Sequence, residues 1–125
     1  MGSLQTVMKD SREFARAVAM WADEKKAEEV MILDLRGLSD ITDFFVLCNG
    51  LSTPQLKAIA THIKQSAKES GKVPIGREGD FGGAWVVLDF GDVVVHIFKP
   101  DAREFYCLED YWNDAPREAL SSPDV

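Results

Sequence analysis

The stretch that decides the fold runs from Trp85 to Phe98 and reads Trp85-Val-Val-Leu-Asp-Phe90, then Gly91-Asp92, then Val93-Val-Val-His-Ile-Phe98. Two runs rich in β-branched and aromatic residues flank a two-residue loop, which is the pattern of a tight β-hairpin. With Gly91 and Asp92 as the loop, position 90 pairs with 93, 88 with 95 and 86 with 97. The sequence therefore predicts an antiparallel hairpin whose register is fixed.

The two faces of this predicted ribbon differ in chemistry, because successive side chains of a strand point to opposite sides. One face is wholly apolar and belongs in a core; it carries Val86, Leu88, Phe90, Val93, Val95 and Ile97. The other face mixes aromatic rings with a carboxylate and an imidazole; it carries Trp85, Val87, Asp89, Val94, His96 and Phe98. Two interpretations fit the mixed face. It is either a second packed layer under a helix or a partner-binding surface anchored by Trp85.

The rest of the chain completes a single α/β domain with a mixed sheet and flanking helices. Apolar periodicity predicts helices at about 7–25, 52–71 and 101–116, and apolar runs at 30–35 and 42–48 predict central strands. A short edge strand is expected at 73–75 and a mobile glycine-rich loop at 77–83. In the last helix we expect a buried stripe of Phe105, Leu108 and Trp112. The domain is expected to span 1–116, with 117–125 as a flexible C-terminal tail.

The composition of the chain favours a protein partner. Its 125 residues carry a formal net charge of −7, which argues against a bare phosphate backbone as the main partner. An acidic surface suits a basic protein, although the same charge also serves solubility. The two cysteines lack metal-ligand spacing, and the sequence shows neither a signal peptide nor a membrane span. We therefore expect a cytoplasmic protein without a membrane partner.

The sequence lacks a complete set of catalytic groups. The turn Gly50-Leu51-Ser52 between a strand and a helix resembles that of nucleotidyltransferases, whose next strand carries two carboxylates one residue apart to hold Mg²⁺. Here Asp34 stands alone in its strand, and the pair Glu78 and Asp80 falls in the expected loop. Both cysteines lie in apolar segments typical of a core. The sequence predicts no catalytic residue, metal site or cofactor.

The ordered set of motifs resembles the ribosomal silencing factor family, also called Iojap-like, from about residue 8 to residue 114. The residues that carry the resemblance are Thr42-Asp43-Phe44-Phe45-Val46, Gly50, Ser52, Gln55, Ala58-Ile59-Ala60, Glu78-Gly79, Trp85, Leu88-Asp89-Phe90-Gly91-Asp92, Val95-His96-Ile97-Phe98, Arg103, Tyr106, Leu108-Glu109 and Trp112. Asn49 replaces the serine usual before this glycine, and Tyr111 stands where an aliphatic residue is more common.

The resemblance implies a nucleotidyltransferase-like fold without the catalytic carboxylates. It implies binding to the large ribosomal subunit through ribosomal protein fourteen, which sterically blocks joining of the small subunit and represses translation under nutrient limitation. It further implies a possible homodimer and no direct sequence-specific contact with nucleic acid. The interface tryptophan of the family matches Trp85, and the other expected partner-binding residues are Asp89, Tyr106, Glu109 and Asp110. A large-subunit assembly factor and a metal-dependent nucleotidyltransferase are the alternatives.

Overall fold

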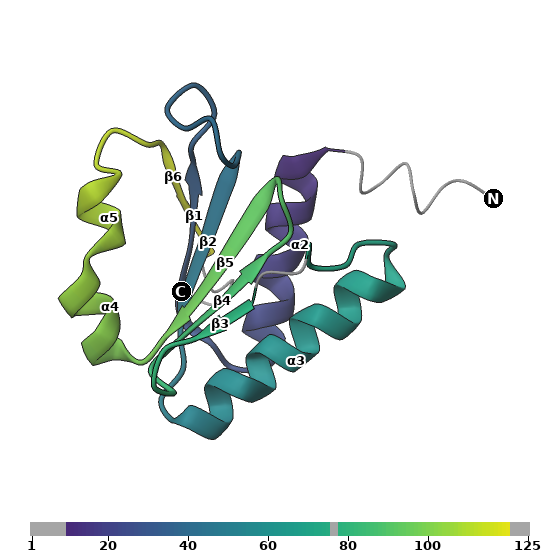
Figure 1. Ribbon diagram of the computed structural model, residues 1–125, viewed down its shortest axis with the longest axis vertical. Helices are drawn as coiled ribbons and strands as arrows, with labels where there is room; N and C mark the ends of the chain where they lie inside the picture. Colours follow the sequence, from purple (N-terminus) through teal and green to yellow (C-terminus); the bar gives the residue numbers. More distant parts are fainter. Residues whose placement is uncertain (1–9, 76–77, 121–125) are drawn as a thin grey trace.

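The computed structural model describes residues 10–75 and 78–120, and its centre is a six-stranded mixed sheet (Figure 1). The strands are β1 (Glu28–Asp34), β2 (Phe44–Asn49), β3 (Glu78–Asp80), β4 (Trp85–Asp89), β5 (Val93–Phe98) and β6 (Arg117–Ala119). Their order across the sheet is β3-β4-β5-β2-β1-β6. β2 and β5 run parallel, and the other neighbouring strands run antiparallel. This is the α/β class with a mixed sheet that the sequence predicts.

The hairpin of β4 and β5 has the predicted register. Val86 lies opposite Ile97 and Leu88 opposite Val95, and the amide of Phe90 donates to the carbonyl of Val93 at 2.9 Å. Gly91 has a φ of 91°, a left-handed conformation that glycine adopts without a steric cost. The apolar face of the ribbon is buried throughout, as predicted.

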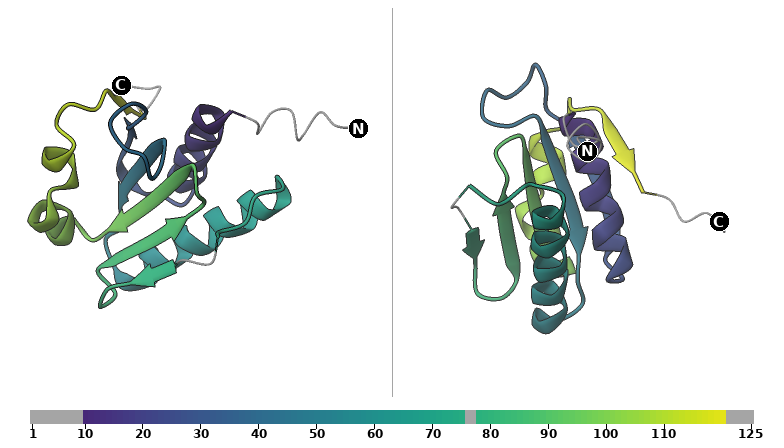
Figure 2. Two further views of the ribbon diagram at one scale, coloured as in Figure 1. Left: turned by 45° about the horizontal axis from the view of Figure 1, so that its top comes forward. Right: turned by 90° about the vertical axis from the view of Figure 1, so that its right-hand side faces the viewer.

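Helices cover both faces of the sheet (Figures 1 and 2). α2 (Ser11–Glu24) and α3 (Thr53–Glu69) pack on one face through the apolar stripes that their sequences predict. α4 (Pro100–Tyr106) and α5 (Leu108–Tyr111) lie on the other face, above a smaller core. Strands β1 and β2 contribute side chains to both cores, so they are central and covered on two sides, as expected.

The ends of the two longer helices follow from local chemistry. Asp10 caps α2 by accepting a hydrogen bond from the amide of Arg12, while Val7, where the predicted helix begins, lies outside the described residues. Ser52 caps α3 by accepting from the amide of Gln55 at 3.2 Å, and Gly71 follows its end with a φ of 92°. Within the described segments, no helix has the length and apolar character that a membrane crossing needs.

The glycine-rich segment differs from the prediction of a mobile loop. Glu78–Asp80 forms β3, which pairs with β4 in the register Gly79 opposite Val87. β4 would otherwise have an unpaired edge, and β3 satisfies its exposed backbone groups. Residues 73–75, predicted as the edge strand, form none; the amide of Ile75 makes one hydrogen bond to the carbonyl of Asp89 at 2.9 Å.

The predicted last helix is two short helices. Cys107 has a left-handed backbone conformation with a φ of 50°, which ends α4 and precedes α5. The break rotates the predicted apolar stripe. Leu108 and Trp112 still pack on the smaller core, but Phe105 is 79% exposed, so the prediction of a buried Phe105 is wrong.

The sheet also extends past the predicted end of the domain. Arg117–Ala119 forms β6 against β1, with Glu118 opposite Ile32, so these three residues, expected in the flexible tail, belong to the sheet. Residues 121–125 of the expected tail lie outside the described residues. The carboxylate of Glu118 also forms an ion pair with Nε of Arg16 on α2 at 3.0 Å, which links β6 to that helix. A three-residue strand gives too short a pattern to be predicted from the sequence.

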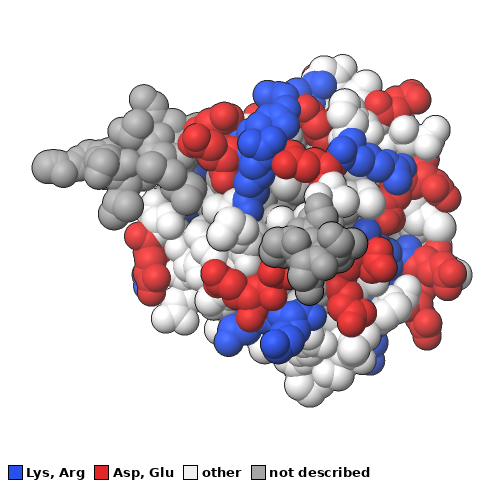
Figure 3. Space-filling model, turned by 180° about the vertical axis from the view of Figure 1, so that it is seen from behind, with Lys and Arg blue, Asp and Glu red and all other residues white. Residues whose placement is uncertain are grey.

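The back of the molecule shows basic and acidic side chains intermingled (Figure 3).

His96 is buried in the smaller core, between the rings of Phe45 and Phe98. Burial disfavours the charged imidazolium and lowers the pKa of His96 to about 4. The imidazole is therefore neutral near pH 7.

Removing β6 should destabilise the domain. A chain ending at residue 116 loses the backbone hydrogen bonds between β6 and β1 and the ion pair of Glu118, and we expect its free energy of unfolding to fall by about 2 kcal/mol. A chain ending at residue 120 keeps β6 and serves as the control. Urea denaturation of both chains measures the difference. Equal stability of the two chains would show that β6 contributes nothing to the fold.

Acid should destabilise the protein through His96. In the unfolded chain the histidine titrates near 6.5, whereas in the fold its pKa is about 4, so between these values the unfolded chain binds more protons. The stability from this group is complete above about pH 6.5, falls as pH drops, and is lost by about pH 4, a change of up to about 3 kcal/mol. Urea denaturation across this range should show a shallower pH dependence for His96→Leu. Parallel curves for the two proteins would contradict the assignment.

Candidate functional site

An aromatic cluster lies at the start of β4, on the face of the sheet that carries α4. The half-buried ring of Trp85 stacks on Phe98 with a centroid distance of 5.1 Å. It also contacts the ring of Tyr106 at 4.6 Å and that of Phe81 at 5.1 Å. The structure therefore brings together two of the residues that the sequence predicts for the partner site, Trp85 and Tyr106.

The outer rings of this cluster are open to solvent. Phe81 is 54% exposed, Tyr106 is 47% exposed, and Phe105 contacts Tyr106 edge-on at 5.1 Å. We call Phe81, Trp85, Phe105 and Tyr106 the aromatic surface. Contiguous exposed aromatic rings are unusual on a monomer and mark sites of interaction. Sequence reasoning missed Phe81 and placed Phe105 in the core. A phenylalanine among the glycines at 79, 82 and 83 was the available signal, since so open a segment offers it little to pack against.

Beneath the aromatic surface, the indole of Trp85 donates a hydrogen bond from Nε1 to Nδ1 of His96 at 3.1 Å. An indole nitrogen can only donate, so Nδ1 must be the acceptor. The low pKa of His96 keeps its imidazole neutral near pH 7, so one of its two ring nitrogens carries no proton, and the hydrogen bond identifies that nitrogen as Nδ1. The sequence places both residues on one face of the hairpin but does not indicate that they bond.

Asp89 lies on the same face of β4 as Trp85 but at the other end of the strand, roughly 13 Å away at the usual rise per residue. Its carboxylate accepts a hydrogen bond from the amide of Gly91 at 2.8 Å. Asp89 thus stabilises the hairpin turn and lies outside the aromatic surface.

Glu109 binds an arginine of its own chain. Its carboxylate accepts from Nε of the buried Arg103 at 2.9 Å and lies 2.8 Å from Nη2. The same guanidinium donates to the carbonyl of Glu29 on β1 and to the side-chain oxygen of Asn49 on β2. Arg103 therefore fastens α4 and α5 to the sheet. Tyr106 and Glu109, both expected in the one helix at 101–116, lie in different sites because the chain breaks at Cys107.

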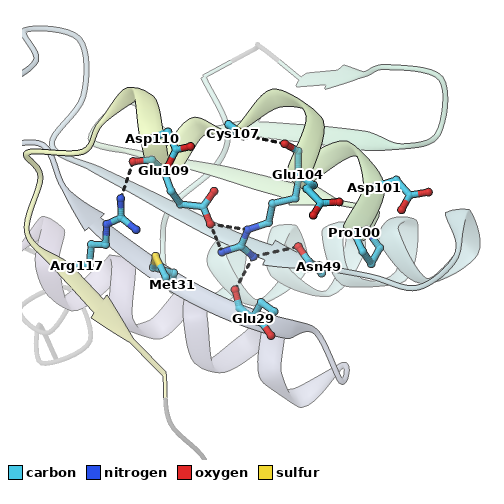
Figure 4. Close-up of a pocket in the computed structure, with 11 residues that line it drawn as sticks. Glu29, Met31, Asn49, Pro100, Asp101, Glu104, Cys107, Glu109, Asp110 and Arg117 are labelled. Atoms are coloured by element: carbon cyan, nitrogen blue, oxygen red, sulfur yellow. Dashed lines mark hydrogen bonds and ion pairs between the residues drawn. The ribbon is translucent and has the colours of Figure 1, made fainter.

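A groove of about 510 Å³ surrounds this arginine, between α4, α5 and the ends of β1 and β2 (Figure 4). Its lining carries more acidic than basic side chains; the charged members are Glu29, Asp101, Arg103, Glu104, Glu109, Asp110 and Arg117. Asp110 is exposed at this groove, where its carboxylate can meet a basic group. Of the predicted carboxylates, Asp110 is the one whose exposure suits direct contact with a partner.

Two residues that could serve in catalysis, Asp34 and Cys48, lie in environments that do not suit that role. Asp34 on β1 is engaged by Arg36 at 2.8 Å and Arg12 at 3.1 Å, and the hydrogen bond from Arg36 lowers the pKa of its carboxyl. Burial raises the pKa of Cys48 to about 12, so its thiol stays protonated. Among residues 10–75 and 78–120, no three His, Cys, Asp or Glu side chains are grouped as metal ligands.

Known proteins resemble this chain over most of its length. A family model described as "Ribosomal silencing factor during starvation" matches residues 8–125. The ribosomal silencing factor RsfS of Halalkalibacterium halodurans is 45% identical over 111 residues, covering 88% of this chain and 94% of that protein. A mouse protein named "Mitochondrial assembly of ribosomal large subunit protein 1" is 28% identical over 92 residues, covering 71% of this chain and 40% of its own length.

The fold is also similar to a solved structure. A crystal structure of a protein from Chromobacterium violaceum superposes with a TM-score of 0.79 at 28% identity, covering 90% of this chain and 94% of that one. Sequence and fold agree, and they agree with the motifs of the hairpin and the last helices. The chain belongs to the ribosomal silencing factor family.

Proposed function

We propose that this protein binds the large ribosomal subunit through ribosomal protein fourteen and sterically blocks joining of the small subunit, which represses translation when nutrients are limiting. The observation that carries the proposal is the aromatic surface on a chain of the ribosomal silencing factor family. The protein acts in the cytoplasm, needs no cofactor, and makes or breaks no bond. A bound, folded domain excludes the second subunit by its volume alone.

The aromatic surface suits a docking anchor for a physical reason. Water contacts the exposed rings of Phe81, Phe105 and Tyr106 in the free protein, and removing that apolar area from water favours association. Trp85 is held from below and beside by other rings, so little conformational freedom remains for its indole to lose on binding. Large, rigid aromatic residues are the commonest binding hot spots.

Charge supports the same partner class. The exposed carboxylates of Asp101, Glu104 and Asp110 lie along α4 and α5, beside the aromatic surface. We assign direct contact to Trp85, Tyr106 and Asp110. Glu109 acts through Arg103 and Asp89 through the hairpin turn, so both support the site without touching the partner.

A role in large-subunit assembly is the second candidate, and the name of the mouse relative favours it. Assembly and silencing need the same docking surface. They differ in the particle recognised, since a silencing factor must bind mature large subunits. A homodimer stays a prediction, which light scattering of the purified protein at two concentrations tests.

Co-sedimentation tests the proposed function. Purified protein is centrifuged with isolated bacterial large subunits, with small subunits, and with neither. We expect migration with mature large subunits alone. Migration with neither subunit, or only with small subunits, would reject the proposal, and migration only with immature large particles would favour assembly.

Tyr106→Glu should weaken binding to the large subunit by about 2 kcal/mol, roughly thirtyfold in Kd. The charge would face apolar partner atoms, while the half-exposed position should leave the fold intact. Met20→Glu is the matched control, because Met20 is 56% exposed on α2, across the sheet. Circular dichroism checks folding, and titration with large subunits gives Kd. Equal affinities for the two variants would remove Tyr106 from the interface.

Association should slow as salt rises. A chain with a net charge of −7 approaching a basic protein gains rate from long-range attraction, which dissolved ions screen. Stopped-flow measurements at about 50 and 500 mM monovalent salt should give an association rate that is lower at the higher concentration. A rate that does not change with salt would contradict the electrostatic part of the proposal.

A further inference from the structure

The hydrogen bond between Trp85 and His96 joins neighbouring strands beneath the aromatic surface. His96 lies opposite Val87 in the β4–β5 register, so it is the diagonal neighbour of Trp85 on the same face. The distance of 3.1 Å from Nε1 to Nδ1 is that of a formed hydrogen bond. This bond fixes the direction of the indole N–H, and hence which ring edge turns outward.

The other nitrogen of His96 has no such partner. Since Nδ1 accepts from the indole, the proton of the neutral ring sits on Nε2. Nε2 is buried and has no hydrogen-bond partner among the described residues. A buried donor left unsatisfied costs stability, and a leucine at this position would avoid that cost. The fold therefore retains a histidine where packing alone favours an apolar residue.

The imidazole of His96 is itself held in place by packing, so it can fix the orientation of a group that bonds to it. The ring of Phe45 packs against it edge-on at 4.5 Å, and Phe98 lies parallel to it at 6.1 Å. His96 itself is buried on a central strand of the sheet. By contrast, Trp85 is partly exposed at the start of β4, and exposed rings such as Tyr106 form its outer neighbours. The buried Nδ1 of His96 is therefore a fixed hydrogen-bond acceptor for the partly exposed indole of Trp85, whose orientation depends on such a bond.

We propose that His96 is a positioning residue for docking: its Nδ1 orients the indole of Trp85 so that the aromatic surface is preformed for the partner. The inference rests on the proposed function, because it assigns His96 a role in that same interface. His96 touches no partner atom and acts only through Trp85. Docking then costs less conformational entropy than it would with a freely turning indole.

Two variants of His96 separate positioning from packing. His96→Leu fills the core without an acceptor, and His96→Asn places a side-chain oxygen near the position of Nδ1. We expect His96→Leu to be at least as thermostable as the unaltered protein, yet to bind isolated bacterial large subunits about tenfold more weakly. His96→Asn should be less thermostable but bind more tightly than His96→Leu. If affinity follows thermostability across the three proteins, His96 is only a packing residue and the proposal fails.

A double-mutant cycle with Trp85→Phe tests whether His96 acts through the indole. Phenylalanine can still stack on Phe98 but lacks the N–H. We expect His96→Leu to weaken binding in the unaltered protein and to have no further effect in Trp85→Phe. Equal effects in both backgrounds would overturn the positioning role while leaving the proposed function standing. If neither single variant nor Tyr106→Glu weakens binding, the aromatic surface itself is not the docking site.

One measurement on the unaltered protein covers the case in which a variant does not fold. Nuclear magnetic resonance of ¹⁵N-labelled protein at pH 7 should show scalar coupling between Nε1 of Trp85 and Nδ1 of His96 across the hydrogen bond. It should also show slow solvent exchange of that indole proton. Free exchange without coupling would overturn the proposal, whatever the variants do.

Discussion

The parallel pairing of β2 with β5 is the constraint on which the rest of the structure depends. Six residue pairs, from Phe44 with Val93 to Asn49 with Phe98, join the first half of the chain to the hairpin of the second half. Both strands are buried on their two faces, so helices must cover both. α2 and α3 supply one cover, which leaves α4 and α5 for the other. The same pairing sets His96 beside Phe45, in reach of Trp85.

The aromatic surface is exposed because α4 and α5 cover only part of the second face of the sheet. α4 and α5 are short and pack over a small core, and the guanidinium of Arg103 ties them to backbone and side-chain oxygens of β1 and β2. A short cover leaves rings at its border, where Tyr106 and Phe105 meet Trp85 and Phe81. The exposure of these rings thus arises from the same break at Cys107 that shortens α4.

The sequence predicts the parts of this structure that local pattern controls. The hairpin register follows from alternation, the stripes of α2 and α3 from helical periodicity, and the central place of β1 and β2 from continuous apolar runs, each within one segment. The features that the sequence does not indicate lie where contacts between separate segments decide the structure. Glu109 meets Arg103 because a left-handed Cys107 turns the chain, and Arg103 in turn reaches Glu29, far away in sequence. β3 and β6 are three residues each and owe their conformation to the edges of β4 and β1. Of the predicted site, Trp85 and Tyr106 do come together, whereas Asp89 lies at the far end of its strand.

Subunit joining tests the central claim most directly. Large subunits are incubated with the protein, small subunits are added, and light scattering follows the formation of whole ribosomes. The account predicts that joining falls in proportion to the fraction of large subunits occupied, because one folded domain on the joining face excludes the small subunit. Normal joining while the protein remains bound to the large subunit would contradict steric silencing.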